Sequence, residues 1–385
     1  MEIRLLLSFW EYCLIVLWLL SAITTVHFYL KCYRPVPKHV FPAPDGNPQG
    51  VSVILSGKNH SESLKQNLVF WLQQDHPCYE VVVVHEKNDE ETLFLIEDLR
   101  RKFPRLRGVN ANQSINFFNE QLFSLSIGVR AARYDHVILT SPLCRPASEK
   151  CISLMQAAFR NDTQAVVGLV EPFPLDKAGK SFRCYREIER RMEYIGAALN
   201  GQAFTGERSL IAYRKDIFLE HQGYTGCYAL DIGNFDLLAM HIENPKRAGV
   251  QALPEAAVIS QIPSPPSLFR TEREYRNILA RKTTKAAMRI RTYHIAESVF
   301  WILAVAGCAL AGYQLRQDGI SRFPSWIPVF LSIGIAKYCI QAYYMQKAGS
   351  KLKYGLFWFA LPIYGFLYIP LLFAPVTRKK KNKPK

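Results

Sequence analysis

The chain has 385 residues, of which 49% are hydrophobic and 21% are charged. That balance excludes a disordered or collagen-like chain and leaves room for two or three folding units. The formal net charge is +16, and much of the excess lies in residues 270–291 and 378–385, both next to apolar runs. This placement favours anionic membrane lipids as a partner. The sequence contains no recognisable nucleic-acid motif, so nucleic acid is not an expected partner.

The nine cysteines do not form a CxxC pair or a spacing typical of metal ligands. Several of them, including Cys13, Cys308 and Cys339, fall inside apolar stretches. We therefore expect small buried side chains in a reducing compartment, without a disulfide framework.

Four apolar runs predict membrane segments. Residues 5–30 are long enough to cross a hydrocarbon core, which takes roughly 20 helical residues, and they lack a typical cleavage site, so they predict a retained anchor. Three further runs lie near the C-terminus, at 295–315, 326–345 and 354–376. The second carries polar residues at helical spacing and the third contains two prolines, so either could lie at the interface instead of crossing.

The distribution of positive charge predicts the orientation of the chain. Short basic flanking segments mark the cytoplasmic side of a membrane. If residues 31–293 are cytoplasmic and all three late runs cross the membrane, the basic tail ends outside the cytoplasm, which contradicts this rule. An even number of late crossings removes this conflict. We therefore expect an integral membrane protein with a cytoplasmic soluble domain, two late crossings and one interfacial or re-entrant segment.

The soluble region shows the pattern of an open α/β sheet. Five prolines between residues 33 and 50 predict a stiff linker. Short Val- and Ile-rich runs then alternate with amphipathic segments, and these runs predict strands at 51–56, 79–84, 106–111 and 136–141. Strands of this kind form a parallel sheet covered by helices on both faces. Ligands bind such sheets beyond the carboxyl ends of the strands, so we expect chemistry at 57–60, 85–89 and 142–145.

An ordered series of segments resembles family 2 glycosyltransferases. It opens with SVILSGKNHSESLKQNLVFWLQQDHPCYEVVVVHEKNDEET and continues through SIGVRAARYDHVILTSPLCRP, FTGERSLIAYRKDIF and GNFDLL, covering roughly residues 50–290. The resemblance implies a GT-A fold, the α/β architecture of nucleotide-diphospho-sugar transferases, with a mixed, mainly parallel sheet flanked by N- and C-terminal transmembrane helices. It also implies a nucleotide-sugar donor and a lipid-linked or cell-surface glycan acceptor.

These patterns together predict six segments. They are an N-terminal transmembrane anchor (1–32), a Pro-rich linker (33–50), a glycosyltransferase-like domain (51–269), a basic interfacial helix (270–293), C-terminal transmembrane segments (294–376) and a basic tail (377–385).

The resemblance assigns three residues to a nucleotide cradle. Asn59 stands where the family has an Asn after its first strand, and Glu86 and Asn88 stand where the family contacts base and ribose. The alternative is that Asn59 caps the next helix and Glu86 is a solvated loop carboxylate. His85 departs from the Asp that the family has at this position.

The family's metal-binding Asp-x-Asp aligns with Ser141, Pro142 and Leu143. These residues do not provide the carboxylate ligands of a hard divalent cation, so no metal or other cofactor is expected, and Mg²⁺ or Mn²⁺ would require a different alignment. Ser141 remains a candidate donor-binding residue. Arg145 is either a fixed positive charge for the diphosphate or a member of a structural ion pair.

The family's catalytic base, after a Gly at the start of a helix, aligns with Phe235, which cannot accept a proton. Asp236 and Asp231 are the candidate replacements. The alternative for Asp236 is an acid in the first turn of a helix, stabilised by the helix dipole.

A basic helix follows the sugar-transfer region. Membrane-bound members of the family have a Gln-x-x-Arg-aromatic motif here, and Ile278 and Lys282 replace its Gln and aromatic residue. We interpret the helix as lying along anionic headgroups. Its membrane-surface residues are Arg273, Arg276, Arg281, Lys282 and Lys285.

Two functions are consistent with these residues. The first is a membrane glycosyltransferase that works without a metal. The second is a non-catalytic relative that binds a nucleotide, a glycan or a partner glycosyltransferase at the membrane. A retained fold does not guarantee retained chemistry.

Overall fold

The computed structural model divides the chain into two compact units. The helical unit comprises residues 1–37, 178–189 and 266–385, and the α/β unit comprises residues 38–177 and 190–265. The residues that the structure describes are 9–44, 48–56, 60–86, 88–111, 120–160, 162–172, 182–220, 222–224, 235–236, 245–260, 268–281, 284–318, 324–352 and 363–366.

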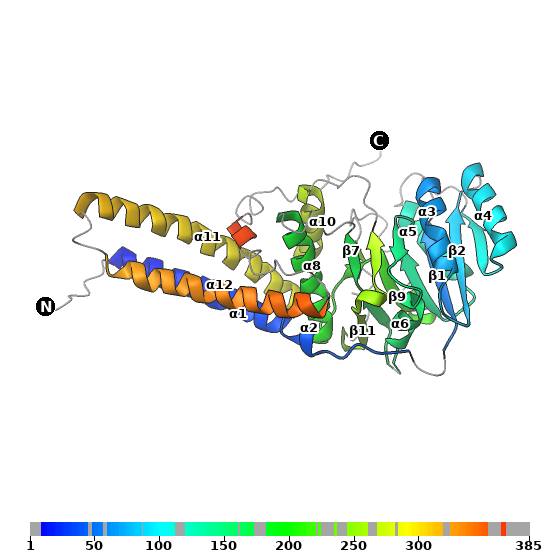
Figure 1. Ribbon diagram of the computed structural model, residues 1–385, viewed down its shortest axis with the longest axis horizontal. Coiled ribbons are helices and arrows are strands. Elements are labelled where there is room, and N and C mark those ends of the chain that lie inside the picture. Colours follow the sequence, from blue (N-terminus) through cyan, green and yellow to red (C-terminus); the bar gives the residue numbers. More distant parts are fainter. Residues whose placement is uncertain are drawn as a thin grey trace. The chain divides into compact units, whose positions relative to one another are not determined.

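A seven-stranded sheet forms the centre of the α/β unit (Figure 1). Its order is β11-β6-β9-β4-β1-β2-β3, and every neighbouring pair is parallel except those made by β9. The strands are β1 (Val51–Ser56), β2 (Tyr79–His85), β3 (Leu106–Asn110), β4 (His136–Thr140), β6 (Ala165–Gly168), β9 (Leu210–Arg214) and β11 (Ala248–Gln251). The mixed, mainly parallel sheet expected from the sequence is confirmed.

Helices cover both faces of this sheet because its central strands are apolar on both sides. Val53 and Val81 belong to the core that also contains Trp71 of α3, whereas Ile54 faces the other side, where Gly128 of α5 packs against it. A Cβ at Gly128 would lie 2.3 Å from the Ile54 side chain, so only glycine allows this close approach. The described residues of the α/β unit form α3 (Ser61–Leu72), α4 (Glu90–Lys102), α5 (Glu120–Ala131), α6 (Cys151–Ala157) and α9 (Lys215–Glu220), together with the 3₁₀ turns η3 (Pro245–Arg247) and η4 (Pro254–Ala256).

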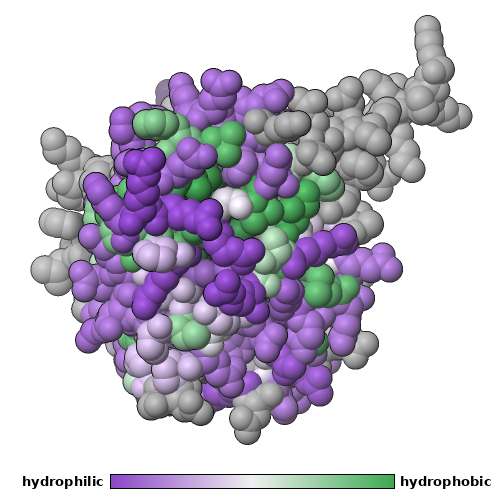
Figure 2. Space-filling view, turned by 90° about the vertical axis from the view of Figure 1, so that its right-hand side faces the viewer, coloured by the Kyte–Doolittle hydropathy of each residue, from purple (hydrophilic) through white to green (hydrophobic). Residues whose placement is uncertain are grey.

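Two smaller sheets also lie in the described part of the α/β unit. One has the order β5-β12-β7, built from β5 (Cys144–Pro146), β12 (Val258–Ser260) and β7 (Val170–Pro172). The other pairs β8 (Gly206–Glu207) with β10 (Phe235–Asp236) in antiparallel fashion. Figure 2 shows the end of the unit that carries α3 and α4, which hydrophilic residues cover for the most part, with only small separate hydrophobic patches.

The helical unit contains α1 (Phe9–Cys32), α2 (Pro35–Lys38), α10 (Leu268–Arg281), α11 (Lys285–Asp318) and α12 (Trp326–Lys351). The division between the units falls within α8 (Phe182–Leu199). Trp18 of α1 stacks on Phe300 of α11 and Phe330 of α12, with ring centroids 3.7 and 4.2 Å apart. Its indole N–H also donates to the Phe330 carbonyl at 3.1 Å, so one side chain ties three helices together.

Among the residues that the structure describes, two helical segments are long and apolar enough to cross a membrane, Phe9–Lys38 and Lys285–Gln317. They correspond to the predicted anchor and the first late run. The second run forms α12, which is helical but carries the buried polar residues Lys337 and Gln341. Of the third run, only residues 363–366 are described, and the predicted boundary at 293 falls inside α11. The predicted linker contains one short helix, α2.

Charged and polar side chains are buried between the helices of the helical unit. Lys337 donates to Glu297 at 2.8 Å, and both are almost completely buried. Glu189 of α8 accepts from Tyr29 and Tyr185 at 3.1 and 3.0 Å and also from Tyr293. Arg186 binds Glu189 and Glu272 at 2.8 Å each. This network joins α1, α8, α10, α11 and α12, so the packing of the unit depends on satisfying these groups.

The α/β unit has a smaller polar anchor at Glu80 of β2. The buried carboxylate accepts from Ser52 at 2.7 Å, from the Arg133 amide at 2.6 Å and from Arg107 at 2.7 Å. Burial by itself would raise the pKa of Glu80, but the hydrogen bonds from Arg107, Arg133 and Ser52 outweigh burial and lower it. The anchor fixes β1, β2 and β3 at the edge where these strands begin.

We expect Glu80→Gln to destabilise the full chain by about 2 kcal/mol at pH 7, because an amide cannot satisfy the donors that surround the carboxylate. Since the pKa of Glu80 is lower in the folded chain, its stabilisation is complete above the unfolded-state pKa and is lost as pH falls through the folded-state pKa. Thermal unfolding in detergent should therefore separate variant from wild type at pH 7 and less so in acid. The exposed Glu97→Gln on α4 is the control, and an equal loss there would contradict the prediction.

For the helical unit, Lys337→Met should destabilise the chain by about 3 kcal/mol, because it leaves the Glu297 carboxylate buried without its cation. The double variant Lys337→Met with Glu297→Gln should recover most of the loss. Thermal unfolding in detergent measures both effects. Lys347→Met, on the exposed face of the same helix, provides the control and should change the unfolding temperature little. A double variant no more stable than Lys337→Met would argue against the ion pair.

Candidate functional site at the carboxyl edge of the sheet

The parallel strands bring their carboxyl ends to one edge of the large sheet. Ser56 pairs with Val84, Leu55 pairs with Thr140, and His85 pairs with Asn110, so β1, β2, β3 and β4 end close together. The residues that follow these strands therefore share one region, as expected for an open α/β sheet. Of the predicted cradle residues, Glu86 and Asn88 lie there, whereas Asn59 lies outside the described residues.

Glu86 and Asn88 occupy the connection between β2 and α4. The ring Nδ1 of His85 lies 3.0 Å from the Glu86 carbonyl, and the His85 ring is buried. Asp89 caps α4 by accepting from the Thr92 amide at 3.0 Å. Glu86 is half-buried and Asn88 is exposed. The Asp89 cap therefore holds a short polar loop beyond the carboxyl end of β2.

A hydrogen-bonded turn follows β4. The Leu143 amide donates to Ser141 Oγ at 3.3 Å, and the Cys144 amide donates to the Ser141 carbonyl at 2.9 Å. From α3, the buried Asn67 side chain donates to the Pro142 carbonyl at 2.9 Å. The turn is therefore fixed by its own backbone and by α3, in the place where the sequence resemblance puts the Asp-x-Asp.

The residues of this turn do not fit a divalent cation. Ser141 Oγ already accepts the Leu143 amide, the Pro142 carbonyl accepts Asn67, and Leu143 has an apolar side chain. Among the described residues, no group of three or more His, Cys, Asp and Glu side chains could hold a metal ion. Hard cations such as Mg²⁺ and Mn²⁺ prefer carboxylate oxygens.

Arg145 lies on β5, immediately after this turn. Its guanidinium is 5.4 Å from the centroid of the Phe70 ring, and both residues line a pocket of about 290 Å³ beside α3. The contact is a cation–π interaction, a third arrangement in addition to the two considered from the sequence.

The candidate base residues are placed differently from the expectation. The resemblance puts the aligned stretch at the start of a helix, but Phe235 and Asp236 form the strand β10. The prediction of a helix start here is wrong, because these residues pair with β8 instead. The Asp236 side chain is not described, and Asp231 lies outside the described residues.

The sequence reasoning missed a carboxylate at this edge, Glu207 of β8. Its side chain is largely buried, and its Oε1 lies 3.8 Å from Nε of the buried Arg191. Burial raises the pKa of Glu171 on β7, and the positive charge of Arg191 acts in the opposite direction. In the sequence, Glu207 and Arg208 stand together just before the residues that form the buried strand β9, and this adjacency alone does not distinguish them from a solvated turn.

The turn after β4 ends at a buried cysteine, Cys144. Burial raises the pKa of the Cys144 thiol to about 11, and the negative charge of Glu207 raises it as well. Hydrogen bonds with Ser260, Ser209 and Ser141 act in the opposite direction. Cys144 is thus a buried structural thiol.

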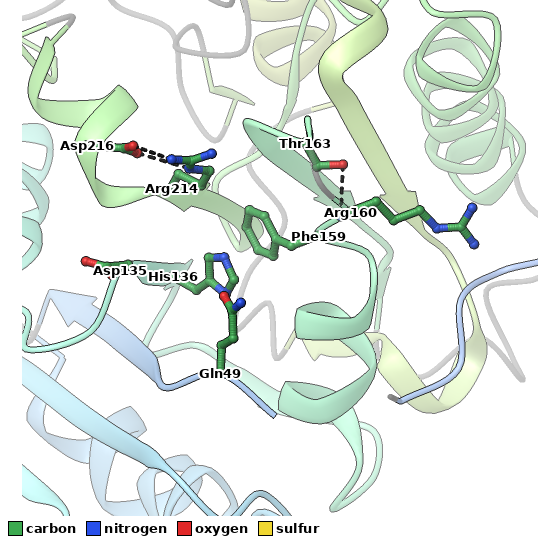
Figure 3. Close-up of a pocket in the computed structure, with 8 residues that line it drawn as sticks. All are labelled: Gln49, Asp135, His136, Phe159, Arg160, Thr163, Arg214 and Asp216. Carbon is green, nitrogen blue, oxygen red and sulfur yellow. Dashed lines mark hydrogen bonds and ion pairs between the residues drawn. The ribbon is translucent and has the colours of Figure 1, made fainter. Parts of the chain in front are cut away.

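A larger pocket, of about 500 Å³, lies at the opposite edge of the sheet (Figure 3). Its lining includes His136 at the start of β4 and Arg214 at the end of β9, and the His136 ring stacks on Phe159 with centroids 4.1 Å apart. Arg214 is paired with Asp216. Because this is the amino edge of β4, the pocket is not part of the candidate site.

The predicted membrane-surface residues are divided between two helices. Arg273 and Arg276 are half-buried on α10, whose neighbouring Tyr275 is fully buried, and Lys285 is exposed at the start of α11. Arg281 ends α10, but its side chain is not described, and Lys282 lies outside the described residues. One face of α10 therefore packs inside the helical unit.

Comparisons with known proteins support a glycosyltransferase fold. Residues 14–188 match the model of glycosyl transferase family 21, which supports a glycosyltransferase but does not single out family 2. No curated protein matches the chain in sequence. A solved structure of the mannosyltransferase PcManGT from Pyrobaculum calidifontis, in complex with GDP-Man and Mn²⁺, covers 94% of this chain and 98% of its own, at 14% identity and a TM-score of 0.57.

A second structure, S. aureus TarS 1-349 in complex with UDP-GlcNAc, covers 85% of this chain and 90% of its own, at 14% identity. Its TM-score of 0.42 is too low to support an argument. The likeness to the mannosyltransferase establishes the fold: the chain has a GT-A-like architecture, with a mixed, mainly parallel sheet and two apolar helices long enough to cross a membrane.

Proposed function

We propose that the α/β unit binds a nucleotide sugar and that the chain transfers the sugar to a hydroxyl acceptor at a membrane. The observation that carries this proposal is the match of residues 14–188 to glycosyl transferase family 21. The GT-A-like fold supports it, although a fold alone does not establish a reaction. The relation to family 2 inferred from residues 50–290 remains part of the proposal.

The proposed donor site is the carboxyl edge of the sheet. Glu86 and Asn88 would contact the nucleoside, and Ser141 would lie near the diphosphate, with Asn59 as a further candidate. Arg145 lies over the Phe70 ring, and its guanidinium N–H groups would be candidate donors to a phosphate. The PcManGT structure was determined with GDP-Man, so we infer a nucleoside diphosphate sugar as the donor and leave its base open.

The proposed acceptor is a lipid-linked or cell-surface glycan. The two apolar helices support a membrane setting, and the basic residues of 270–291 support contact with anionic lipids on the cytoplasmic side. Arg273, Arg276 and Lys285, with Arg281 and Lys282, would supply that contact. The six predicted segments, from the anchor to the basic tail, describe this arrangement along the chain.

We expect nucleotide binding to be independent of metal, because the turn at Ser141 lacks carboxylates. UDP or GDP should raise the unfolding temperature of the detergent-purified chain in EDTA, by the equivalent of about 2.7 kcal/mol at 100 times the dissociation constant. Adding Mn²⁺ should give no further increase. AMP is the control nucleotide. Absence of stabilisation by any nucleoside diphosphate would count against the proposed function, and stabilisation only with Mn²⁺ would count against the metal-free site.

Introducing carboxylates at positions 141 and 143 tests whether the turn after β4 faces the donor's diphosphate. The double variant Ser141→Asp with Leu143→Asp should bind nucleotide more tightly when Mn²⁺ is added, because two carboxylates would then face the diphosphate. The matched control is Ser141→Asn with Leu143→Asn, which has similar side-chain size without charge. The measurement is the nucleotide-dependent unfolding temperature with and without Mn²⁺. Equal responses of the two variants would mean that this turn does not face the donor.

The second candidate function is a non-catalytic subunit that binds a nucleotide or a partner glycosyltransferase. The observation that favours it is the replacement of carboxylates at 141, 143 and 235. Nucleotide binding without release or transfer of sugar from UDP- and GDP-linked donors would support this candidate. Turnover of any of these donors would exclude it.

A further inference from the structure

The pocket at the amino edge of β4 has a volume of about 500 Å³, and its lining residues all belong to the α/β unit. Small-molecule sites usually have volumes of about 300–1,000 Å³. His136 begins β4 and Thr140 ends it, so the pocket lies about 13 Å along the strand from the carboxyl edge. A ligand in this pocket would therefore occupy a site separate from that of the proposed donor.

The walls of this pocket are fixed by contacts within the unit. His136 of β4 is in antiparallel register with Arg214 of β9, so these two side chains come from paired strands. A second wall follows α6, where the Thr163 amide donates to the Arg160 carbonyl at 2.7 Å and the Arg160 amide donates to Thr163 Oγ1 at 3.1 Å. The His136 ring stacks on Phe159, with centroids 4.1 Å apart, and joins the two walls. Walls formed in advance lower the cost of ordering the site when a ligand binds.

The polar groups that line the pocket carry no net charge. Arg214 is paired with Asp216, and its Nε donates to Oδ1 at 3.3 Å. Burial and the positive charge of Arg214 lower the pKa of His136, whereas Asp135 and Asp216 act in the opposite direction, so the imidazole is mainly neutral at pH 7. The Asp135 carboxylate and the Arg160 guanidinium point away from the His136 ring in opposite directions, and their charges cancel (Figure 3). This balance suits an uncharged ligand and disfavours a phosphate.

One buried polar group in the wall lacks a partner. His136 is only 7% exposed, and its Nδ1 makes no hydrogen bond to any residue that the structure describes. Buried polar atoms are almost always paired with protein, water or a ligand. A neutral imidazole offers one N–H donor and one acceptor nitrogen. A ligand that both donates and accepts hydrogen bonds would satisfy this side chain.

The other lining groups narrow the class of ligand. The exposed Gln49 side chain extends toward the side of the pocket that holds His136 (Figure 3). Its amide has a donor and an acceptor side by side, and a sugar ring presents neighbouring hydroxyls that each donate one hydrogen bond and accept others. The half-buried Phe159 adds an apolar surface for the C–H groups of such a ring. An amide, an imidazole, an ion pair and an aromatic ring together match an uncharged sugar.

We propose that this pocket is a second carbohydrate site, which binds uncharged sugar units of a glycan at the amino edge of the sheet. Gln49 and His136 exchange hydrogen bonds with the sugar hydroxyls, and the ring lies against Phe159. The inference goes beyond the proposed function, because binding here requires neither a nucleotide sugar nor sugar transfer. Such a site would hold a glycan on the chain in a transferase and in a non-catalytic subunit alike.

The experiment uses the full-length chain in a polyoxyethylene detergent, which has no sugar headgroup. A glycan array carries neutral oligosaccharides of glucose, mannose, galactose and N-acetylglucosamine beside sialylated and sulfated ones, with UDP and GDP added to fill the proposed donor site. Neutral oligosaccharides should be retained in preference to charged ones. Titration calorimetry then gives the dissociation constant of the best neutral oligosaccharide, which should change little with salt because the ligand is uncharged.

His136→Phe keeps the stacking on Phe159 but removes both ring nitrogens, and Gln49→Leu removes the amide. Each should raise the dissociation constant of that oligosaccharide about three- to tenfold, the equivalent of one hydrogen bond. Gln66→Leu, the same change at an exposed position on α3, is the matched control and should leave binding unchanged. Stabilisation by UDP or GDP should be the same in all three variants. If His136→Phe folds poorly, Gln49→Leu and the salt series still test the site.

Retention of no neutral oligosaccharide, or a preference for charged ones, would overturn the inference and leave an ordered water as the partner of His136. Binding that neither His136→Phe nor Gln49→Leu weakens would place the glycan elsewhere and overturn it as well. Absence of stabilisation by UDP and GDP, with oligosaccharide binding intact, would count against the proposed function alone.

Discussion

Parallel hydrogen bonding among β1, β2, β3 and β4 is the constraint on which the rest of the α/β unit depends. Parallel strands cannot be joined by tight turns, so each needs a crossover, and all their carboxyl ends emerge at one edge. Residues far apart in the sequence, such as Glu86 and Ser141, are brought to that edge by the pairing of β1 with β2 and β4. The Glu80 anchor stabilises the opposite edge, where a charged group can be fixed without intruding on the proposed donor site.

The strands that the sequence predicted best are those whose side chains are buried on both faces. Runs such as VSVILS and YEVVVV are mostly apolar and do not alternate between apolar and polar residues, as expected for strands buried on both faces. The observed strands β1 and β2 match these runs to within one residue. β10 could not be predicted in this way, because two residues do not make a pattern and their conformation depends on pairing with β8. This dependence explains the error at Phe235 and Asp236. The resemblance implied the start of a helix, whereas pairing with β8 makes these two residues a strand.

The candidate site was predictable in position and only partly in its residues. The carboxyl-edge rule located the loops of Glu86 and Ser141 before any contact was known. The sequence could not show that Arg145 lies over Phe70, since that contact joins α3 to β5. It also could not single out Glu207, because Glu and Arg in adjacent positions usually indicate a solvated turn. In the structure, Glu207 is buried and lies 3.8 Å from the buried Arg191, and this burial distinguishes it from a glutamate in a solvated turn.

The two units use buried charge for different purposes. In the helical unit, Lys337 and Glu297 bind each other directly at 2.8 Å, and Glu189 accepts three tyrosine hydroxyls, so these carboxylates are engaged by strong donors. These buried, hydrogen-bonded ion pairs fix the packing of the helices, and removing one partner strongly destabilises the folded chain. In the α/β unit, Glu80 accepts from Ser52, Arg107 and the Arg133 amide, so its buried carboxylate fixes the amino ends of three strands instead of the packing of helices.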